Sequence, residues 1–369
     1  MQTRDDEMWD VAIAGAGISG LTCALALQEA GYRVIVVDKS KGVGGRAATR
    51  RLEHTWVDHG APTLSRNLED EAQYGTYVTT LLEKSLIQPW PAAQIYRAAV
   101  HQGRWHLDKC EASGTIQDSG TIQDYAAPAG MTAIAKALTD NLDICRAQRV
   151  TKVQLDSQQS YWQIATEATA KDLPITLRAR ALVLAMPAPQ ALDLCTPLLE
   201  AGIDPSAIAA LKNVRFDPCI TTMAGYRSGE NPFWSELCCQ DDPIIQRILC
   251  DRHKRPIPEV EHGETWFVIH STPVFAAQHF HESDLTALGQ QILEHLGQVY
   301  RPWMAQPFAF QVHRWRYAIA SGGYPGDPLS ANMSLPLWIC GDWCTGNKIQ
   351  DAFEVGLDVA QRIHHQLSV

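Results

Sequence analysis

The chain has 369 residues, of which 46% are hydrophobic and 20% charged, so it is long enough for two structural domains and has an ordinary globular composition. Its 31 basic and 41 acidic residues give a net charge of −10, which speaks against nonspecific nucleic-acid binding. The first ten residues lack the pattern of a secretion signal, and no stretch approaches the roughly 20 apolar residues of a membrane span. Ten scattered cysteines lack metal-ligand spacing and fit reduced thiols. We therefore expect a cytoplasmic protein with no metal site and no membrane or nucleic-acid partner.

The first part of the sequence predicts a strand, a glycine turn, a helix and a second strand. Residues 8–14 form a short apolar run, residues 21–30 have helical apolar spacing, and Gly31 stops the helix. Residues 34–37 are β-branched throughout, as in a buried strand. This order is that of a βαβ unit.

The turn of this unit has the spacing Gly-x-Gly-x-x-Gly. Gly15 allows a tight turn, Gly17 lets the backbone approach a pyrophosphate, and Gly20 lets the helix pack closely on the strand. The free N–H groups at the start of the helix suit an anion. Asp38 ends the second strand, where a carboxylate accepts hydrogen bonds from an adenosine ribose. The residues predicted to contact the nucleotide here are Gly15, Gly17, Ile18, Ser19, Gly20, Asp38 and Lys39.

A second glycine turn distinguishes between FAD and NAD as the cofactor. An acid at position 38 disfavours a ribose with a 2′-phosphate, so FAD or NAD fits better than NADP. Gly44, Gly45 and Arg46 follow directly, and a second turn with an arginine there would close over the pyrophosphate from the other side. A simple NAD dehydrogenase does not need this turn, so the pattern favours FAD.

With these motifs the chain resembles the amine-oxidase-like FAD superfamily, in which a Gly-Gly-Arg turn follows the first βαβ unit. The segment "WVDHGAP", with Asp58, His59, Gly60 and Ala61, resembles the next segment of that superfamily, which runs alongside the isoalloxazine. More narrowly, four segments resemble the renalase family and its bacterial relatives: "GMTAIAKAL" (130–138), "ALVLAMPAPQAL" (181–192), "HRWRYA" (313–318) and "CGDWCTGNKIQDAFEVGLDVA" (340–360). The match extends over nearly the whole chain, and "HRWRYA" is its most specific part.

The resemblance implies an α/β fold with a Rossmann-like FAD-binding domain and a second α+β substrate domain, the p-hydroxybenzoate-hydroxylase or amine-oxidase-like two-domain architecture. We expect residues 1–60, 125–190 and 311–369 in the FAD-binding domain. We expect residues 61–124 and 191–310 in the substrate domain, as an antiparallel sheet with helices. One of these helices has Leu285, Leu288, Ile292, Leu293 and Leu296 on one face.

The same resemblance implies that two distant parts of the chain hold one FAD. The first turn would hold the ADP half, and Asp342 would bond the ribityl or pyrophosphate region. A helix from about Gln350 would direct its N-terminus at the flavin N1–C2 edge, where a helix stabilises negative charge by roughly 0.3–2 kcal/mol. The alternative is that "GDWCTG" is only a loop before a terminal helix. The further FAD contacts implied are Gly45, Arg46, His59, Gly60, Ala61, Val150, Gly341, Asp342, Gln350 and Ala352.

The cofactor is expected to be noncovalent. In "SGGYPG" (321–326), Tyr324 stands where monoamine oxidases have the cysteine that is bonded to FAD. The tandem repeat "SGTIQD" (113–118 and 119–124) predicts a hairpin extension or a duplicated loop, since two copies cannot build a stacked core.

The stretch "QVHRWRYA" alternates as a strand does. Arg314 and Arg316 would share one face, and Trp315 and Tyr317 would share the other with His313. Two adjacent arginines are costly to bury without anions, and the phosphates of a substrate would supply them, while the aromatic residues would pack on a planar ring. The alternative is that these four residues brace the two domains through ion pairs and core packing.

The renalase resemblance implies an FAD-dependent oxidase of isomeric dihydronicotinamides, the 2- or 6-dihydro forms of NAD(P). A hydride would pass to flavin N5, and dioxygen would be reduced to hydrogen peroxide. No catalytic acid–base pair is conspicuous in the sequence. The alternatives are an amine oxidase or carotenoid-type desaturase, and a flavin-binding redox sensor without turnover. Pro62, Thr63 and Leu64 replace the Gln and aromatic residue usual in the family after Asp-His-Gly-Ala, and this departure bears on the substrate rather than on the cofactor.

Overall fold

The structure is a computed structural model that describes residues 7–53, 55–68, 72–90, 94–110, 122–158, 160–227, 232–254, 263–324 and 326–368. The "SGTIQD" repeat lies outside the described residues except for 122–124. The chain forms two compact units. Unit 1 comprises Met1–Ala47, Ile134–Arg215 and Ala320–Val369, and unit 2 comprises Ala48–Ala133 and Phe216–Ile319. The predicted division into a cofactor and a substrate domain stays a prediction.

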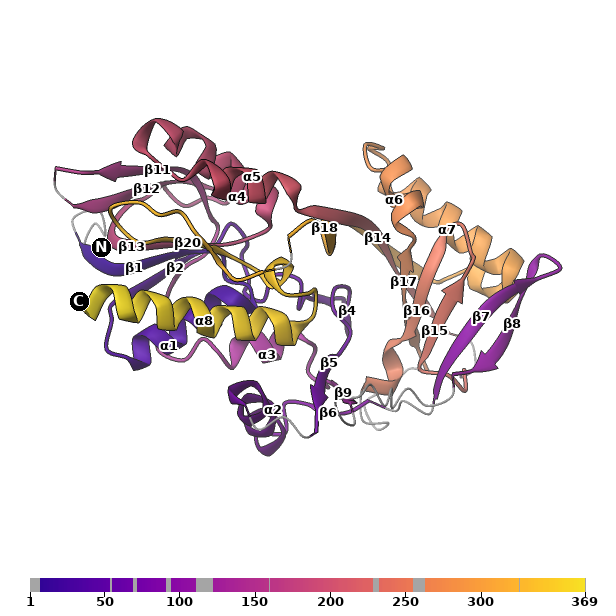
Figure 1. Ribbon diagram of the computed structural model, residues 1–369. Helices are drawn as coiled ribbons and strands as arrows, with labels where there is room; N and C mark the ends of the chain where they lie inside the picture. The colour runs from indigo at the N-terminus through magenta and orange to yellow at the C-terminus, as the bar shows by residue number, and fades with distance from the viewer. Residues whose placement is uncertain are drawn as a thin grey trace. The chain divides into compact units, whose positions relative to one another are not determined.

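Unit 1 is built on a sheet with a parallel, buried centre (Figure 1). Its parallel strands are, in spatial order, β10 (Asp143–Cys145), β2 (Val34–Val37), β1 (Met8–Ala14), β13 (Thr176–Ala185) and β20 (Leu337–Cys340). The antiparallel additions are β12 (Tyr161–Ala168) and β11 (Gln148–Asp156) beside β13, and β19 (Leu329–Ser330) beside β20. β2 and β20 are completely buried, and because both faces of these strands are covered, their residues are apolar throughout.

Helices cover this sheet. Figure 1 shows α1 (Ile18–Glu29) and α8 (Ile349–Ser368) side by side below the strands. The contact is close because Gly356 has no side chain: a Cβ there would lie 2.4 Å from the Ser19 carbonyl oxygen. The remaining helical segments of this part of the chain are α3 (Thr132–Lys136), α4 (Ala188–Cys195), η3 (Thr196–Ala201), α5 (Pro205–Asn213) and η7 (Asp342–Cys344).

Unit 2 is built on a seven-stranded, mostly antiparallel sheet. In spatial order its strands are β18 (Ala309–Gly322), β14 (Arg215–Tyr226), β17 (Thr265–Ser271), β16 (Ile245–Cys250), β15 (Glu236–Gln240), β7 (Ile95–His101) and β8 (Arg104–Lys109). Two smaller sheets pair β3 (Thr49–Arg51) with β4 (Trp56–Asp58), and β5 (Leu64–Asn67), β9 (Ile122–Ala126) and β6 (Gln88–Pro89). The helical segments are α2 (Gln73–Glu83), η4 (Asp251–Lys254), α6 (Pro273–Gln278), α7 (Leu285–Val299) and η6 (Pro302–Ala305).

The two faces of the large sheet differ. One face packs on α6 and α7 (Figure 1), and the predicted apolar stripe of α7 is confirmed: Leu288, Ile292, Leu293 and Leu296 are buried in this core, with Leu285 packed at its edge. The other face has a smaller apolar cluster that includes Val57, Trp90, Met223, Trp266 and Val268. Strand alternation places Arg247 and His270 on this second face as well, because they share the parity of Leu249 and Val268 along β16 and β17.

Candidate functional site

The first glycine turn connects β1 to α1 in the predicted way. Gly15 has φ +118°, and a Cβ there would lie 2.1 Å from the Ala185 carbonyl oxygen. A Cβ on Gly20 would lie 2.0 Å from the Gly15 carbonyl oxygen, so both positions require glycine. By contrast, a Cβ on Gly17 would meet nothing within 4 Å. The backbone of Gly17 therefore faces open space at the start of α1, with Ile18 and Ser19 in the first helical turn, and this cradle fits a pyrophosphate.

Asp38 lies at the end of β2, next to this turn. Its carboxylate accepts hydrogen bonds from the backbone N–H groups of Ala16 and Ser40, each at 2.7 Å. Each carboxylate oxygen has a second lone pair, so the group still has acceptor capacity for ribose hydroxyls. Lys39 follows with its Nζ 3.4 Å from Gln190 Oε1, and burial lowers the pKa of this lysine although Asp38 opposes the change.

The second glycine turn and the C-terminal Gly-Asp turn meet beside the first turn. Gly44 forms a β-bridge with Gly17, and a Cβ on Gly45 would lie 3.3 Å from the Gly17 Cα. The Arg46 guanidinium forms an ion pair with the buried Asp342 carboxylate at 2.5 Å, across 296 residues of sequence. Both ends of the chain therefore reach the same part of unit 1, as the FAD hypothesis requires.

Hydrogen bonds on both sides of Asp342 hold the Gly-Asp turn in place. The Asp342 carboxylate accepts a hydrogen bond from the backbone N–H of Trp343 at 2.9 Å, and the Trp343 indole donates to the Met186 carbonyl oxygen at 3.0 Å. Gly341 is needed because a Cβ there would lie 2.5 Å from the Trp343 indole nitrogen. The ion pair with Arg46 therefore joins a well-fixed carboxylate.

Helix α8 begins at Ile349, one residue before the predicted start. Sequence reasoning missed the role of Asp351, whose carboxylate accepts hydrogen bonds from the backbone N–H groups of Asn347 and Lys348 at 2.9 and 2.7 Å. An acid in the first turn of a helix is the signal that would have indicated this cap. Gln350 bonds Glu354 on the same helix at 2.7 Å, and the Ala352 N–H donates to the Lys348 carbonyl oxygen. The N-terminus of α8 therefore already has one carboxylate, and the predicted flavin contact there stays a prediction.

Val150 lies in β11 of unit 1, opposite Thr166 of β12 and next to an irregularity in the pairing. Its neighbour Gln148 donates its backbone N–H to the Asp38 carbonyl oxygen at 2.9 Å. The segment that contains Val150 is thus tied to the end of β2, where the adenine half of a dinucleotide was expected.

In unit 2, His59 is the centre of an aromatic group. Its carbonyl oxygen accepts a hydrogen bond from the Trp315 indole at 3.0 Å, and the two rings stack with centroids 5.3 Å apart. The His313 ring meets His59 and Trp315 edge-on, with centroids at 4.9 and 4.4 Å. Arg50 lies 3.4 Å from the His313 Nδ1. Gly60 and Ala61 continue from His59 as a half-buried loop.

Both imidazoles in this group are uncharged at neutral pH. Burial, with contributions from His313 and Arg50, lowers the pKa of His59 to about 3, and Asp58 only partly opposes this change. Burial and Arg50 lower the pKa of His313 to about 4. The Nδ1 of His59 is buried and has no hydrogen-bond partner among the residues that the structure describes. The surroundings of the His59 ring thus disfavour an added positive charge.

The two arginines of "HRWRYA" differ in their surroundings. The Arg314 guanidinium donates to the carbonyl oxygens of Phe280 and Glu282, the latter at 2.9 Å. Arg314 and Arg316 both lie over the Phe280 ring, at 5.1 and 4.9 Å, so they share a face as predicted. Backbone carbonyls thus occupy Arg314, whereas Arg316 is exposed. Tyr317 contacts the Phe216 ring edge-on at 5.5 Å.

Sequence reasoning also missed two cations of unit 2. Lys254 is 1% exposed, and its Nζ lies 2.8 Å from Asp58 Oδ2. Arg247 pairs with the buried Glu236 at 2.6 Å. Burial, with contributions from Arg247 and Lys254, lowers the pKa of His270 to about 3. The Lys254–Asp58 contact joins residues 196 positions apart in sequence, so no local pattern indicates it.

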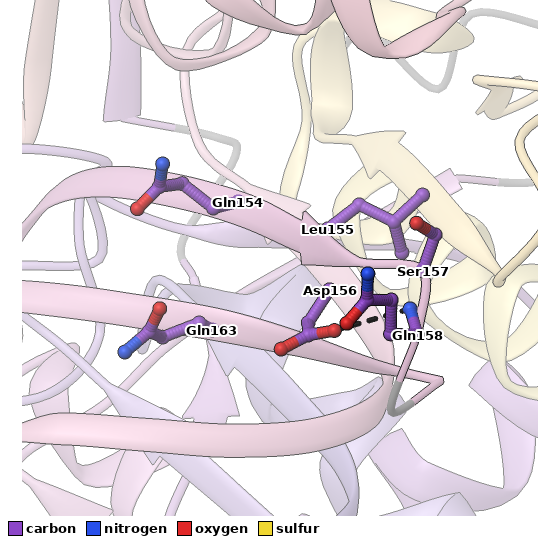
Figure 2. A pocket seen from close by; sticks show the side chains of 6 residues that line it. All are labelled: Gln154, Leu155, Asp156, Ser157, Gln158 and Gln163. Atoms are coloured by element: carbon purple, nitrogen blue, oxygen red, sulfur yellow. Dashed lines mark hydrogen bonds between the residues drawn. The ribbon is translucent and has the colours of Figure 1, made fainter.

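A surface hollow lies at the β11–β12 hairpin and contains none of the predicted site residues. Figure 2 shows its lining, which is polar except for one leucine, with Asp156 accepting a hydrogen bond from the Gln158 backbone at 3.1 Å. It is lined by Gln154, Leu155, Asp156, Ser157, Gln158 and Gln163. We assign it no function.

In the part of the chain that the structure describes, no three His, Cys, Asp or Glu side chains form a group that could hold a metal ion. None of the helices described is both long and apolar enough to cross a membrane.

Comparison with known proteins agrees with this geometry. A model of the NAD(P)-binding Rossmann-like domain matches residues 13–77, which contain the first glycine turn, Asp38 and the second turn. The predicted two-domain α/β fold, with a Rossmann-like domain and an amine-oxidase-type substrate domain, is confirmed. The chain belongs to the flavin-containing amine oxidoreductase family, whose model matches residues 96–364.

Curated relatives match this chain over short stretches of sequence only. Short stretches are similar in sequence to the flavin-containing amine oxidase A of Bos taurus (40% identical over 85 residues) and to the L-amino-acid oxidase of Siganus canaliculatus (49% over 53 residues). These stretches cover 21% and 14% of this chain, and only 16% and 10% of those curated relatives.

Solved structures match over nearly the full length. The cyclohexylamine oxidase from Brevibacterium oxydans IH-35A has a TM-score of 0.70 at 14% identity, covering 98% of this chain and 100% of its own. Wild-type putrescine oxidase bound to putrescine has a TM-score of 0.67 at 14% identity, covering 98% of this chain and 100% of its own. At this identity the likeness is one of fold.

Proposed function

We propose that this protein is an FAD-dependent oxidase that oxidises 2- or 6-dihydro-NAD(P) to NAD(P)+ and holds its FAD noncovalently. Family membership supports a flavin cofactor, and the Gly17 cradle, Asp38 and the Arg46–Asp342 pair fit the two halves of FAD. When bound, FAD would supply the redox chemistry, which is oxidation of the dihydropyridine by hydride transfer and reduction of dioxygen to hydrogen peroxide. A reducing compartment such as the cytoplasm suits the ten free cysteines.

The observation that carries the substrate proposal is the electrostatic character of the His59 group. Arg50, the uncharged His313 imidazole and the Trp315 indole surround the His59 ring, and the pKa of His59 is lowered to about 3. Its neighbour Asp58 is already occupied by Lys254, Thr49 and Met131. Among the described residues of this group, an ammonium substrate would therefore meet the Arg50 guanidinium and a carboxylate that is already paired, whereas a dihydropyridine is neutral and the attached dinucleotide is anionic.

The residues of this chain would then bind and orient rather than transfer protons. The flat Trp315 ring suits stacking against a planar pyridine, and the burial of His59 excludes water from its surroundings. Arg316 would pair with a substrate phosphate, because Arg314 already donates to two carbonyl groups. Holding a ring in a reactive orientation is a large part of what hydride transfer requires.

A second candidate is an amine oxidase, favoured by the match to the flavin-containing amine oxidoreductase model.

One experiment separates these candidates. Purified protein with FAD is mixed without oxygen with 2-dihydro-NAD, 6-dihydro-NAD, ordinary 4-dihydro-NADH, cyclohexylamine or putrescine, and the yellow flavin absorbance is followed. We expect rapid bleaching of the flavin by 2-dihydro-NAD or 6-dihydro-NAD. When air is admitted, the yellow colour should return and hydrogen peroxide should form. Bleaching by the amines alone would establish the second candidate, and bleaching only by 4-dihydro-NADH would indicate a conventional reductase. A protein that no donor bleaches would be a flavin-binding protein without these activities.

A further inference from the structure

The buried ammonium of Lys254 has a specific relation to His59. Lys254 is 1% exposed and its Nζ lies 2.8 Å from Asp58 Oδ2 and 3.8 Å from Asp251 Oδ1. Asp58 is the residue directly before His59 in the chain. The pair thus places a compensated carboxylate beside the imidazole.

The hydrogen bonds of Asp58 show that its position is fixed from several sides. Its Oδ1 accepts from the Thr49 hydroxyl at 2.7 Å and from the Met131 N–H at 2.8 Å, and its own N–H faces Asp251 Oδ1 at 3.4 Å. With Lys254 on Oδ2, both oxygens of the carboxylate are used. A carboxylate this well bonded holds the end of β4 in place.

The same contacts continue into the aromatic group. The His59 N–H donates to the Ala48 carbonyl oxygen at 3.1 Å, and the His59 carbonyl oxygen accepts the Trp315 indole at 3.0 Å. The position of Asp58 therefore constrains that of His59, because a single peptide unit joins them, and its charge acts on the imidazole over a short distance. We propose that Lys254 is a positioning residue: its ammonium neutralises Asp58, and this keeps His59 uncharged and stacked against Trp315.

The physical reason is the balance of charge. Asp58 is the neighbour that favours a charged His59, and burial, His313 and Arg50 oppose it by lowering the pKa. While Lys254 neutralises Asp58, the opposing influences prevail. Without Lys254, the Asp58 carboxylate would lose its counter-charge, and the negative charge that it keeps would favour a proton on the adjacent His59 imidazole. The charged and titratable groups that face this pair and His59 are Asp58, Asp251, Arg50, His313 and, on β17, His270.

The proposal rests on the proposed function, in which the His59 group meets the substrate, but its test does not require turnover. Lys254→Met alone leaves two buried carboxylates and risks misfolding, so two double variants are compared: Lys254→Met/Asp251→Asn and Lys254→Met/Asp58→Asn. Each loses one ammonium and one carboxylate, and they differ only in which carboxylate remains. Lys84→Met, at an exposed lysine of the same unit, is the control.

The measurement is the pH titration of the His59 ring in the FAD-loaded protein, by NMR with 13C-labelled histidine and assignment through His59→Gln. In the parent and in Lys84→Met we expect no titration between about pH 5 and 8. In Lys254→Met/Asp251→Asn the His59 signal should titrate within that range, and in Lys254→Met/Asp58→Asn it should again stay constant. A purely structural role would affect both double variants alike, so equal behaviour of the two would overturn the proposal.

A kinetic arm distinguishes this proposal from the proposed function. In Lys254→Met/Asp251→Asn, kcat/KM for the dihydronicotinamide should fall at least tenfold at pH 6 and recover towards pH 8, where His59 loses its proton, while Lys254→Met/Asp58→Asn should show no such pH dependence. If no dihydronicotinamide is oxidised but the NMR contrast appears, the substrate assignment fails and the role of Lys254 stands. If turnover is present and the contrast is absent, Lys254 has no such role.

Discussion

The first glycine turn allows cofactor binding to be separated from folding by two single-methyl substitutions. Gly17 has φ −76° and ψ 177°, which alanine adopts readily, and a Cβ there meets no protein atom within 4 Å. Gly17→Ala should therefore change the free energy of unfolding of the FAD-free protein by no more than about 0.5 kcal/mol. The methyl group would instead project into the space expected for the pyrophosphate and hold it off the helix N-terminus. We expect FAD to bind at least about tenfold more weakly, which is about 1.4 kcal/mol.

Gly20→Ala is the matched control, because the same methyl group is added three residues later. There the Cβ would lie 2.0 Å from the Gly15 carbonyl oxygen, whereas ordinary contact begins at 3.4 Å, so α1 and the turn would have to separate by the difference of 1.4 Å. Overpacking of this kind costs about 1–3 kcal/mol, and more when backbone has to move. Gly20→Ala should lower the stability of the FAD-free protein by at least this amount.

The assay is urea denaturation of both variants without cofactor, combined with FAD titration followed by flavin fluorescence. A Gly17→Ala protein that binds FAD with the parent's affinity would show that this turn does not hold the cofactor phosphates. A Gly20→Ala protein as stable as the parent would contradict the close packing of α1 on the turn. The two results are independent, so the test separates an error in the site from an error in the fold.

Three further predictions follow from the site. The pKa of His59 is lowered to about 3 in the folded protein and lies near 6.5 in the unfolded protein, so the unfolded state binds more protons between these two pH values. The free energy of unfolding that depends on His59 should therefore fall by about 1.4 kcal/mol for each pH unit between 6.5 and 3. His59→Gln should flatten this pH dependence in urea denaturation, and an unaltered slope would count against a neutral, buried His59. A double-mutant cycle of Arg46→Met and Asp342→Asn should give a coupling of about 0.5–3 kcal/mol in FAD binding or unfolding, and a coupling near zero would mean that the ion pair does not join the two turns. Arg314→Met should lower the free energy of unfolding by about 1–3 kcal/mol, because two backbone carbonyl groups lose their donor. Arg316→Met should change the free energy of unfolding by no more than about 0.5 kcal/mol and should raise KM for the dinucleotide. Equal KM values for the parent and Arg316→Met would remove Arg316 from the substrate site.

Much of unit 1 could be predicted from the sequence because its signals are local. The glycine spacing, the β-branched strand and the acid that ends it occupy fewer than forty consecutive residues, and the structure has β1, α1 and β2 where these signals predict them. The start of α8 was also predicted to within one residue. The Asp351 cap was missed because the sequence was examined there for a ligand at the helix start rather than for a side chain that fills it.

The contacts of unit 2 could not be predicted in the same way. Lys254 and Asp58 are 196 residues apart, and neither lies in a pattern that distinguishes a buried ion pair from two solvated charges. Packing of β4 and η4 against β17 brings these two segments together, and only then does the charge of Asp58 acquire a partner. A sequence motif such as "WVDHGA" can therefore predict a segment that contacts a cofactor, but it gives no information about the lysine elsewhere in the chain that pairs with its aspartate.

The arginines of "HRWRYA" also show that a local sequence pattern predicts the face on which a side chain lies but not its partners. Alternation correctly predicts that Arg314 and Arg316 share a face, and two cations on one face do require compensation. The compensation need not come from an anion, however: backbone carbonyl oxygens and one phenylalanine ring supply it for Arg314. Two neighbouring arginines are thus weak evidence for a phosphate site unless at least one of them still has guanidinium N–H groups to donate. Arg314 already donates to two carbonyl groups, so the exposed Arg316 is the better candidate to bind the substrate.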